Sequence, residues 1–283
     1  MQRLGVVGAG TMGIGIVQVA AQQGLDVIAC EVDEERFRTA MQGLERTLGR
    51  LVERRRLSQG DVDATLGRIK PSTQLSNLAG ADCIIEVVPE VLDIKRRVFE
   101  HLDALCPPET VFATNTSSLS VTELAASTKR PDRFVGLHFF NPVPLMGLVE
   151  IVRGLQTSEA TLGLAREVVS RLGKTAVEVK DTPGFIVNRV ARPFYNEALR
   201  LLNDRVASVE TIDQVMKLGG GFRMGPFELM DLIGNDVNFA VTSQVYAGYF
   251  GEAKYRPSYL QQRVVQAGTL GRKSKKGWYT YDE

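Results

Sequence analysis

The chain has 283 residues, which is long enough for about two domains of ordinary size and for a substantial apolar core. Hydrophobic residues make up 44% and charged residues 24%, so neither a disordered nor a fibrous class fits. The formal net charge is +1, which excludes the strongly basic field typical of proteins that bind nucleic acid or anionic membranes.

The three cysteines, Cys30, Cys83 and Cys106, are odd in number and form no CxxC pair. This pattern predicts neither a disulfide framework nor a zinc site, and it favours a reducing compartment such as the cytoplasm. The apolar stretch Leu4–Gly24 carries glycines and glutamines and lacks a sizeable basic segment before it. It therefore predicts a strand, a tight turn and a helix rather than a signal peptide or membrane span.

Strands and helices are predicted to alternate through residues 1–182. The first strand, Leu4–Val7, is followed by a glycine-rich turn and a helix to Gly24, and the second strand is Val27–Glu31. A long amphipathic helix is expected over Glu34–Leu57. Further strands are expected at Cys83–Val88, Val111–Thr114, Phe134–His138, Leu148–Val152 and Ala176–Val179, with helices at Leu92–Leu105 and Ala160–Leu172. This alternation indicates a Rossmann-type, mostly parallel sheet covered on both faces.

The pattern changes at residues 181–184. Thr182 is expected to cap a helix with Pro183 at its first position, and helical periodicity then continues. Gly219–Gly221 is expected to end one helix and Gly225–Pro226 to begin another, and only Trp278–Tyr281 has a strand-like pattern. The predicted fold class is therefore α/β, with a Rossmann-type domain over 1–182 followed by an all-helical domain over 183–283.

A dinucleotide site is predicted at Gly8, Gly10 and Gly13, which follow a strand and open a helix. The first glycine permits the tight turn, the second lets the backbone approach a pyrophosphate, and the third allows close helix packing. Glu31, at the end of the second strand, is placed to accept hydrogen bonds from the adenosine ribose, which favours NAD over NADP. Arg36 and Arg38 nearby keep NADP open as the alternative.

A catalytic pair is predicted at His138 and Glu150. His138 closes a strand at the sheet edge where such folds bind their ligand, whereas His101 belongs to a charged helical segment. Glu150 interrupts an apolar strand, where a carboxylate is costly without a partner. Prolines and a glycine between the two strands could turn the chain back and bring Glu150 to His138, as a general base with its carboxylate.

Two further polar residues are open to more than one interpretation. Ser117 follows the strand Val111–Thr114, where its hydroxyl could hold a substrate oxygen or the nicotinamide amide, or could be an ordinary turn serine. Asn188 lies one turn into the first helix of the second domain, where an exposed helix amide is the simpler reading.

Several motifs together give the chain a family resemblance over nearly its whole length. The sequence resembles the short-chain (S)-3-hydroxyacyl-CoA dehydrogenases, in particular the bacterial 3-hydroxybutyryl-CoA dehydrogenase type. The motifs are Gly8-Ala9-Gly10-Thr11-Met12-Gly13, Asn115-Thr116-Ser117-Ser118-Leu119, His138-Phe139-Phe140-Asn141-Pro142, Thr182 to Arg189, Gly225 to Leu232 and Gly271-Arg272-Lys273-Ser274.

The resemblance implies NAD-dependent, reversible oxidation of an acyl-CoA substrate, with His138 and Glu150 as the catalytic pair. It places substrate contacts on Ser117, Asn141 and Asn188, and raises Ser117 and Asn188 to site residues. Cofactor contacts are implied at Gly8, Gly10, Thr11, Met12, Gly13, Glu31, Glu90, Lys95 and Asn115. It also implies a homodimer formed through the helical domain, and no membrane or nucleic-acid partner is expected.

The resemblance further implies that the helical excursion near 34–66 covers the CoA moiety. Arg54-Arg55-Arg56 could bind CoA phosphates or could equally be a solvated helix end. The family often has aspartate at the position of Glu31, and glycine and phenylalanine at those of Lys275 and Trp278.

The resemblance leaves two alternative functions open. One is a related dehydrogenase that acts on a free hydroxy acid, and the other is a non-catalytic, crystallin-like NAD-binding protein. The presence of Ser117, His138, Glu150 and Asn188 together favours an enzyme.

Overall fold

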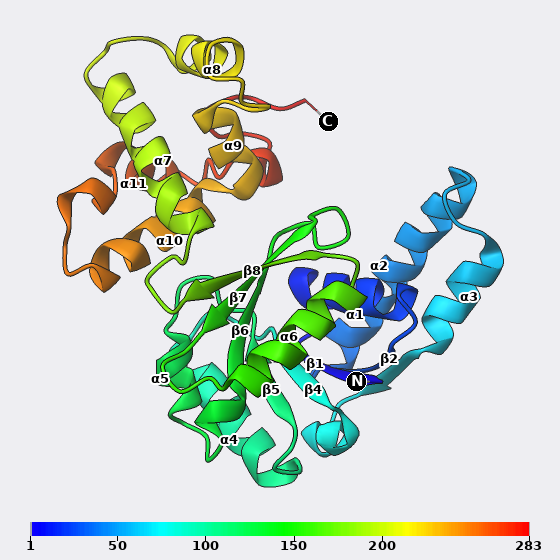
Figure 1. The fold of residues 1–283 in the computed structure, drawn as a ribbon. Helices are drawn as coiled ribbons and strands as arrows, with labels where there is room; N and C mark the ends of the chain where they lie inside the picture. The colour runs from blue at the N-terminus through cyan, green and yellow to red at the C-terminus, as the bar shows by residue number, and fades with distance from the viewer. Residues whose placement is uncertain (1, 283) are drawn as a thin grey trace. The chain divides into compact units, whose positions relative to one another are not determined.

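The computed structural model describes residues 2–282 and separates into two compact units, one ending at Asp181 and the other beginning at Thr182 (Figure 1). The predicted boundary, between 182 and 183, lies one residue further along the chain. The first unit contains a mostly parallel sheet with helices, and the second is built from helices, as the predicted fold class requires. None of the helices within residues 2–282 is long and apolar enough to cross a membrane.

The first unit is built on one eight-stranded sheet with strand order β3-β2-β1-β4-β5-β6-β7-β8. Its strands are β1 (Arg3–Val7), β2 (Asp26–Cys30), β3 (Ile69–Ser72), β4 (Cys83–Glu86), β5 (Val111–Thr114), β6 (Phe134–Phe139), β7 (Leu148–Arg153) and β8 (Thr175–Lys180). All neighbouring strands pair in parallel except β6 and β7, which are antiparallel. The order 3-2-1-4-5-6 is that of dinucleotide-binding folds, which bind ligands at the carboxyl ends of the parallel strands.

Helices cover both faces of this sheet. They are α1 (Thr11–Gln22), α2 (Glu34–Glu53), α3 (Gln59–Gly67), α4 (Leu92–Leu105), α5 (Val121–Ala125) and α6 (Glu159–Arg171), with short 3-10 turns η1 (Leu75–Gly80) and η2 (Pro131–Arg133). Helices α1 and α6 share one apolar core with alternate residues of the strands. On the other face, Phe99 of α4 packs against Phe112 of β5 and Phe134 of β6, with ring centroids 5.8 and 4.5 Å away.

The region after β2 differs from the prediction in two details. The helix expected over 34–57 is present as α2 but ends at Glu53, because Arg54 caps it and Arg55 has a left-handed φ of 55°. Ser58 then begins α3 with a reciprocal capping box to Asp61. Strand β3 was not predicted since its sequence, Ile-Lys-Pro-Ser, has no alternation, but it pairs only with β2. An edge strand tolerates proline because one side of its backbone needs no ladder bonds.

The second unit contains five helices among its described residues. They are α7 (Val187–Asn203), α8 (Val209–Leu218), α9 (Pro226–Ile233), α10 (Asn235–Gly248) and α11 (Tyr259–Gln266), with turns η3 (Ala253–Tyr255) and η4 (Arg272–Ser274). Gly219 ends α8 and Gly225 precedes α9, as predicted. Thr182 is not a helix cap, because its carbonyl accepts a turn bond from the Phe185 N–H and α7 begins only at Val187. Up to Asp282, the end of the chain forms only isolated bridges.

Two buried aspartates hold the end of the chain onto this unit. Asp231 accepts hydrogen bonds from Asn235 Nδ2 (2.7 Å), from the N–H groups of residues 278 and 279 (both 3.0 Å) and from Tyr281 OH (2.9 Å). Asp213 accepts from the N–H groups that open α9 and from Tyr279 OH. The space beside Asp231 admits only glycine at 277, since a Cβ there would lie 2.1 Å from Asp231 Oδ1.

Candidate active site

The glycine loop connects β1 to α1 and has the geometry of a phosphate cradle. Gly8 has φ +103°, and a Cβ there would lie 2.8 Å from the Val87 carbonyl oxygen. A Cβ at Gly13 would lie 1.9 Å from the Gly8 carbonyl, so loop and helix can pack this closely only with glycine. At Gly10 a Cβ would meet nothing within 4 Å. The bare backbone at Gly10 faces open space, which fits close approach of a pyrophosphate.

The amino end of α1 provides donors beside this loop. The helix has no side-chain cap at Gly10 and no acidic residue in its first turn, so its dipole and first N–H groups suit an anion. Thr11 is exposed at the first position of the helix, and Met12 follows it half-buried. These placements suit the cofactor contacts expected of Thr11 and Met12.

Glu31 lies directly after β2, and its half-buried carboxylate reaches the glycine loop. Glu31 Oε2 accepts from the Ala9 N–H at 3.0 Å, and Oε1 accepts from the Asp33 N–H at 3.4 Å. An acidic side chain held at this point is the group that recognises the ribose hydroxyls of a dinucleotide. The glutamate therefore fits the role despite being one methylene longer than aspartate.

His138 and Glu150 are brought together by the antiparallel pairing of β6 and β7. The two residues are direct register partners, and His138 Nδ1 lies 2.7 Å from Glu150 Oε2. Their side chains are only 6% and 1% exposed, so the carboxylate acts on the imidazole with little screening by water. The predicted reversal of the chain between the strands is confirmed, and Asn141 lies exposed at its start. His101, by contrast, is exposed on α4.

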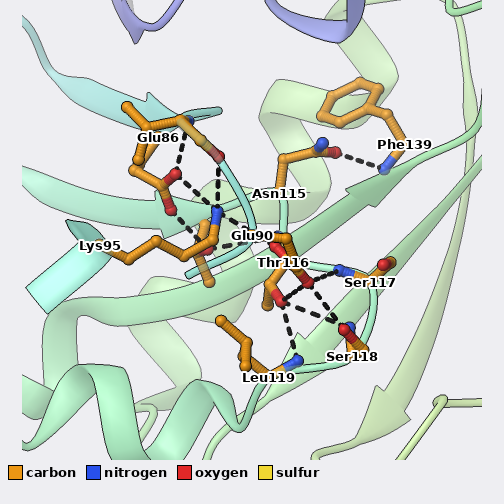
Figure 2. A network of polar contacts seen from close by, with 11 residues as sticks. Glu86, Glu90, Lys95, Asn115, Thr116, Ser117, Ser118, Leu119 and Phe139 are labelled. Carbon is orange, nitrogen blue, oxygen red and sulfur yellow. Dashed lines mark hydrogen bonds and ion pairs between the residues drawn. The ribbon is translucent and has the colours of Figure 1, made fainter. Parts of the chain in front are cut away.

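A second polar cluster occupies the carboxyl ends of β4 and β5 (Figure 2). Glu86 ends β4 and is fully buried, and its Oε1 lies 2.7 Å from Lys95 Nζ. The same ammonium lies 3.3 Å from Glu90 Oε2. Burial raises the pKa of Glu86, whereas Lys95 and hydroxyl donors lower the pKa of Glu90 against the opposing effect of its own burial.

Glu90 accepts several hydrogen bonds from the loop that follows β5. Its Oε1 accepts from Thr116 Oγ1 at 2.5 Å, from the Ser117 N–H at 3.0 Å and from Ser118 Oγ at 2.9 Å. Figure 2 shows that Ser117 directs its backbone N–H at Glu90. Asn115, at the start of the same loop, accepts the Phe139 N–H on its Oδ1 at 2.9 Å, so its amide NH₂ is the group that could reach a cofactor.

Lys95 is not placed as the resemblance implied. Its side chain is 2% exposed, and its ammonium is directed at Glu86, Glu90 and the Val88 carbonyl. An ammonium has three donors, so these contacts occupy all of them. Lys95 therefore supports Glu90 from the interior, and Glu90, whose side chain is 32% exposed, is the member of the pair that can face a ligand.

Glu86 was missed by the sequence reasoning although a signal for it was present. Glu150 attracted notice as a carboxylate inside an apolar strand, and Glu86 interrupts Cys83-Ile84-Ile85-Glu86-Val87-Val88 in the same way. The alternation of the strands places Glu86, His138 and Glu150 on one face of the sheet, opposite the face that carries α1 and α6.

Asn188 belongs to the second unit, in the first turn of α7. Its Oδ1 lies 3.4 Å from Arg192 Nη2, and its backbone carbonyl accepts from Arg192 Nε at 3.1 Å. Arg192 is buried and also donates to the Asn238 carbonyl and to Thr242 Oγ1, and burial lowers its pKa to about 10. Asn188 is therefore half-buried rather than fully exposed, and it contacts Arg192, the residue that binds α10.

A sheet with dinucleotide-binding strand order and a buried His–Glu pair at the carboxyl ends of its strands is the arrangement expected of a nucleotide-dependent oxidoreductase. The family described as "3-hydroxyacyl-CoA dehydrogenase, NAD binding domain" matches residues 3–182, and "3-hydroxyacyl-CoA dehydrogenase, C-terminal domain" matches residues 184–281. The chain therefore belongs to the 3-hydroxyacyl-CoA dehydrogenase family, and its first unit is an NAD-binding domain.

Individual relatives agree with this assignment over the whole chain. A 3-hydroxybutyryl-CoA dehydrogenase of Bradyrhizobium diazoefficiens is 43% identical over 99% of this chain and 96% of its own length. The crystal structure of (S)-3-hydroxybutyryl-CoA dehydrogenase from Ralstonia eutropha covers all of both chains at 42% identity, with a TM-score of 0.96. A 3-hydroxyadipyl-CoA dehydrogenase of Escherichia coli is 46% identical over 99% of this chain, which spans 59% of that longer protein.

Proposed function

We propose that the protein oxidises a short-chain (S)-3-hydroxyacyl-CoA reversibly to the 3-ketoacyl-CoA with NAD, and that 3-hydroxybutyryl-CoA and acetoacetyl-CoA form such a pair. The observation that carries the proposal is the buried His138–Glu150 pair at the carboxyl edge of a dinucleotide-binding sheet. The names of the relatives from Bradyrhizobium and Ralstonia support the choice of substrate.

In the oxidation direction, His138 acts as the general base. Its Nδ1 faces Glu150, so Nε2 is the nitrogen that takes the proton from the C3 hydroxyl. NAD, when bound, supplies the acceptor for the hydride that leaves C3 as the C3–O bond becomes a carbonyl. In the reverse direction the imidazolium of His138 returns its proton to the oxygen.

Glu150 fixes the imidazole in the productive tautomer and stabilises the imidazolium, because a buried carboxylate 2.7 Å away offsets the new charge. Ser117, Asn141 and Asn188 bind the substrate in this proposal. Asn115 and Glu90, together with the glycine loop and Glu31, bind NAD. The gain from such contacts lies in the alignment of the reacting atoms.

The proposal includes a homodimer formed through the second unit. That unit exposes several large apolar side chains, among them Val190, Val215, Leu218 and Phe222. Exposed apolar groups that gather on one part of a protein are typical of an association surface. Sedimentation of the purified protein should give twice the mass of one chain, and a monomer at micromolar concentration would contradict this part.

The decisive test is the oxidation of NADH, and separately of NADPH, with acetoacetyl-CoA and with free acetoacetate. Rapid NADH turnover confined to the CoA ester is expected, with NADPH much slower because the carboxylate of Glu31 repels a 2′-phosphate. Turnover of free acetoacetate would favour the hydroxy-acid alternative. Tight NADH binding without turnover of either substrate would favour the non-catalytic one.

A further inference from the structure

We propose that Glu86 is a positioning residue that sets the conformation of residues 115–119, the Ser117 loop, through Lys95 and Glu90. None of the roles assigned above includes Glu86. The inference rests on the proposed function, since it gives Ser117 and Glu90 their importance. Its experiment has a readout that does not depend on that function.

Glu86 is anchored by donors on both of its carboxylate oxygens. Oε1 accepts from the Val88 N–H and from Lys95 Nζ, both at 2.7 Å, and Oε2 accepts from Thr114 Oγ1 at 2.8 Å. Thr114 is the register partner of Glu86 on β5, and its hydroxyl also accepts the Thr116 N–H at 3.3 Å. One buried carboxylate therefore connects the ends of β4 and β5 with α4.

Glu90 connects Lys95 to the Ser117 loop because its two carboxylate oxygens have different partners. Glu90 Oε2 faces Lys95, whereas Oε1 faces the three donors of the loop. Thr116 Oγ1 in turn fixes the backbone of the next residues, since it accepts hydrogen bonds from the N–H groups of Ser118 and Leu119. Glu90 holds the loop as long as Lys95, which lies closer to Glu86, does not draw it away.

The balance depends on Glu86 because two carboxylates share one ammonium. Lys95 Nζ lies closer to Glu86 than to Glu90, at 2.7 against 3.3 Å. Removal of the Glu86 charge would leave the buried ammonium with a single ionised partner, and their attraction is strong where water is excluded. We expect Glu90 to move towards Lys95 and to release Thr116, Ser117 and Ser118.

A matched control lies elsewhere in the first unit. Asp103 and Arg130 form another buried ion pair, with Asp103 Oδ1 2.7 Å from Arg130 Nε and side chains 6% and 10% exposed. The guanidinium also donates to the carbonyls of Asp103, Cys106 and Pro107. D103N and E86Q thus make the same chemical change, a buried paired carboxylate to an amide, but only Glu86 is linked to the Ser117 loop.

The experiment compares wild type, E86Q and D103N as full chains. Amide hydrogen exchange over residues 115–119 should speed up by about tenfold or more in E86Q and stay unchanged in D103N, while both lose thermal stability. With acetoacetyl-CoA and NADH, kcat/KM should fall by about 10- to 100-fold in E86Q only, since a small displacement of a positioning group has such an effect. NADPH discrimination, set by Glu31, should not change.

Unchanged exchange over 115–119 in folded E86Q would overturn the proposal, as would an equal loss of kcat/KM in D103N. If E86Q fails to fold, the double variant E86Q/K95M removes both charges of the pair and should fold. It should exchange as slowly as wild type over 115–119, because no ammonium then draws Glu90 away from its three loop donors, and fast exchange would overturn the proposal. If wild type reduces no ketoacyl-CoA, the proposed function fails while the exchange comparison still tests Glu86.

Discussion

Buried carboxylates occur in both units, but their partners differ. In the first unit, Glu86 and Glu150 face the ammonium of Lys95 and the imidazole of His138. In the second unit, Asp213 and Asp231 accept mainly backbone N–H groups and tyrosine hydroxyls. Glu86, Glu150, Asp213 and Asp231 are all at most 1% exposed.

Burial of an acid is therefore no guide to its role, whereas the identity of its donors is. A backbone N–H is too weak an acid to give its proton to a substrate or to carry charge at neutral pH, so the second-unit aspartates act by holding the chain in place. Histidine and lysine carry protons or charge that a ligand can use or respond to. The comparison predicts loss of turnover from changes in the first set and loss of stability from changes in the second.

The largest effect is expected for His138→Gln. Loss of the general base should lower kcat with acetoacetyl-CoA by about 10²- to 10⁴-fold, the usual contribution of acid–base catalysis, and leave NADH binding nearly intact. Stopped-flow turnover and NADH fluorescence titration measure the two quantities. A variant that kept more than half of wild-type turnover would remove His138 from the reaction and erase the contrast between the two units.

Asp231→Asn tests the other side of the comparison. The amide retains one acceptor oxygen where the carboxylate used two for its donors, so buried donors lose their partner. We expect the free energy of unfolding to fall by about 2–3 kcal/mol. Urea denaturation measures the loss. The kcat of the folded fraction should stay within about twofold of wild type, and a selective loss of kcat in a fully stable variant would contradict the structural role.

Fold and site were predictable from the sequence to different degrees. The glycine loop and the strand Val111–Thr114 were found because local signals agree with the fold: a strand, a turn that needs glycine and a helix start. Edge strand β3 was missed because pairing with β2, rather than its own pattern, makes it a strand. The inward direction of Lys95, towards Glu86 rather than towards a cofactor, depends on where α4 packs, which no local pattern specifies.

A smaller effect is expected from Cys30 and Cys83, two buried thiols whose charged neighbours are the acids Glu31 and Asp82. Burial raises the pKa of Cys30 to about 11 and that of Cys83 to about 12, from 9.0. Between about pH 9 and pH 10 the unfolded chain loses thiol protons that the folded protein keeps, so stability falls as pH rises. The urea midpoint should decrease over this range, and a midpoint that increased would contradict the assignment.

The smallest effect is expected where the Asp231 contacts hold the end of the chain. Lys275 has φ +58°, and its N–H and carbonyl are both bonded, to the Arg272 carbonyl and the Tyr281 N–H. A left-handed residue with a Cβ costs about 1–2 kcal/mol, and glycine avoids that cost while losing about 0.5–1 kcal/mol in chain entropy. Lys275→Gly should therefore stabilise the protein by about 0.5 kcal/mol.

Lys276→Gly, at a neighbouring position with negative φ, should destabilise it by a similar amount. Thermal unfolding of the pair measures the difference. Equal losses of stability in the two variants would mean that the backbone of Lys275 is not strained. The contacts of Asp231 would then contribute less to the free energy of unfolding than the comparison of the two units predicts.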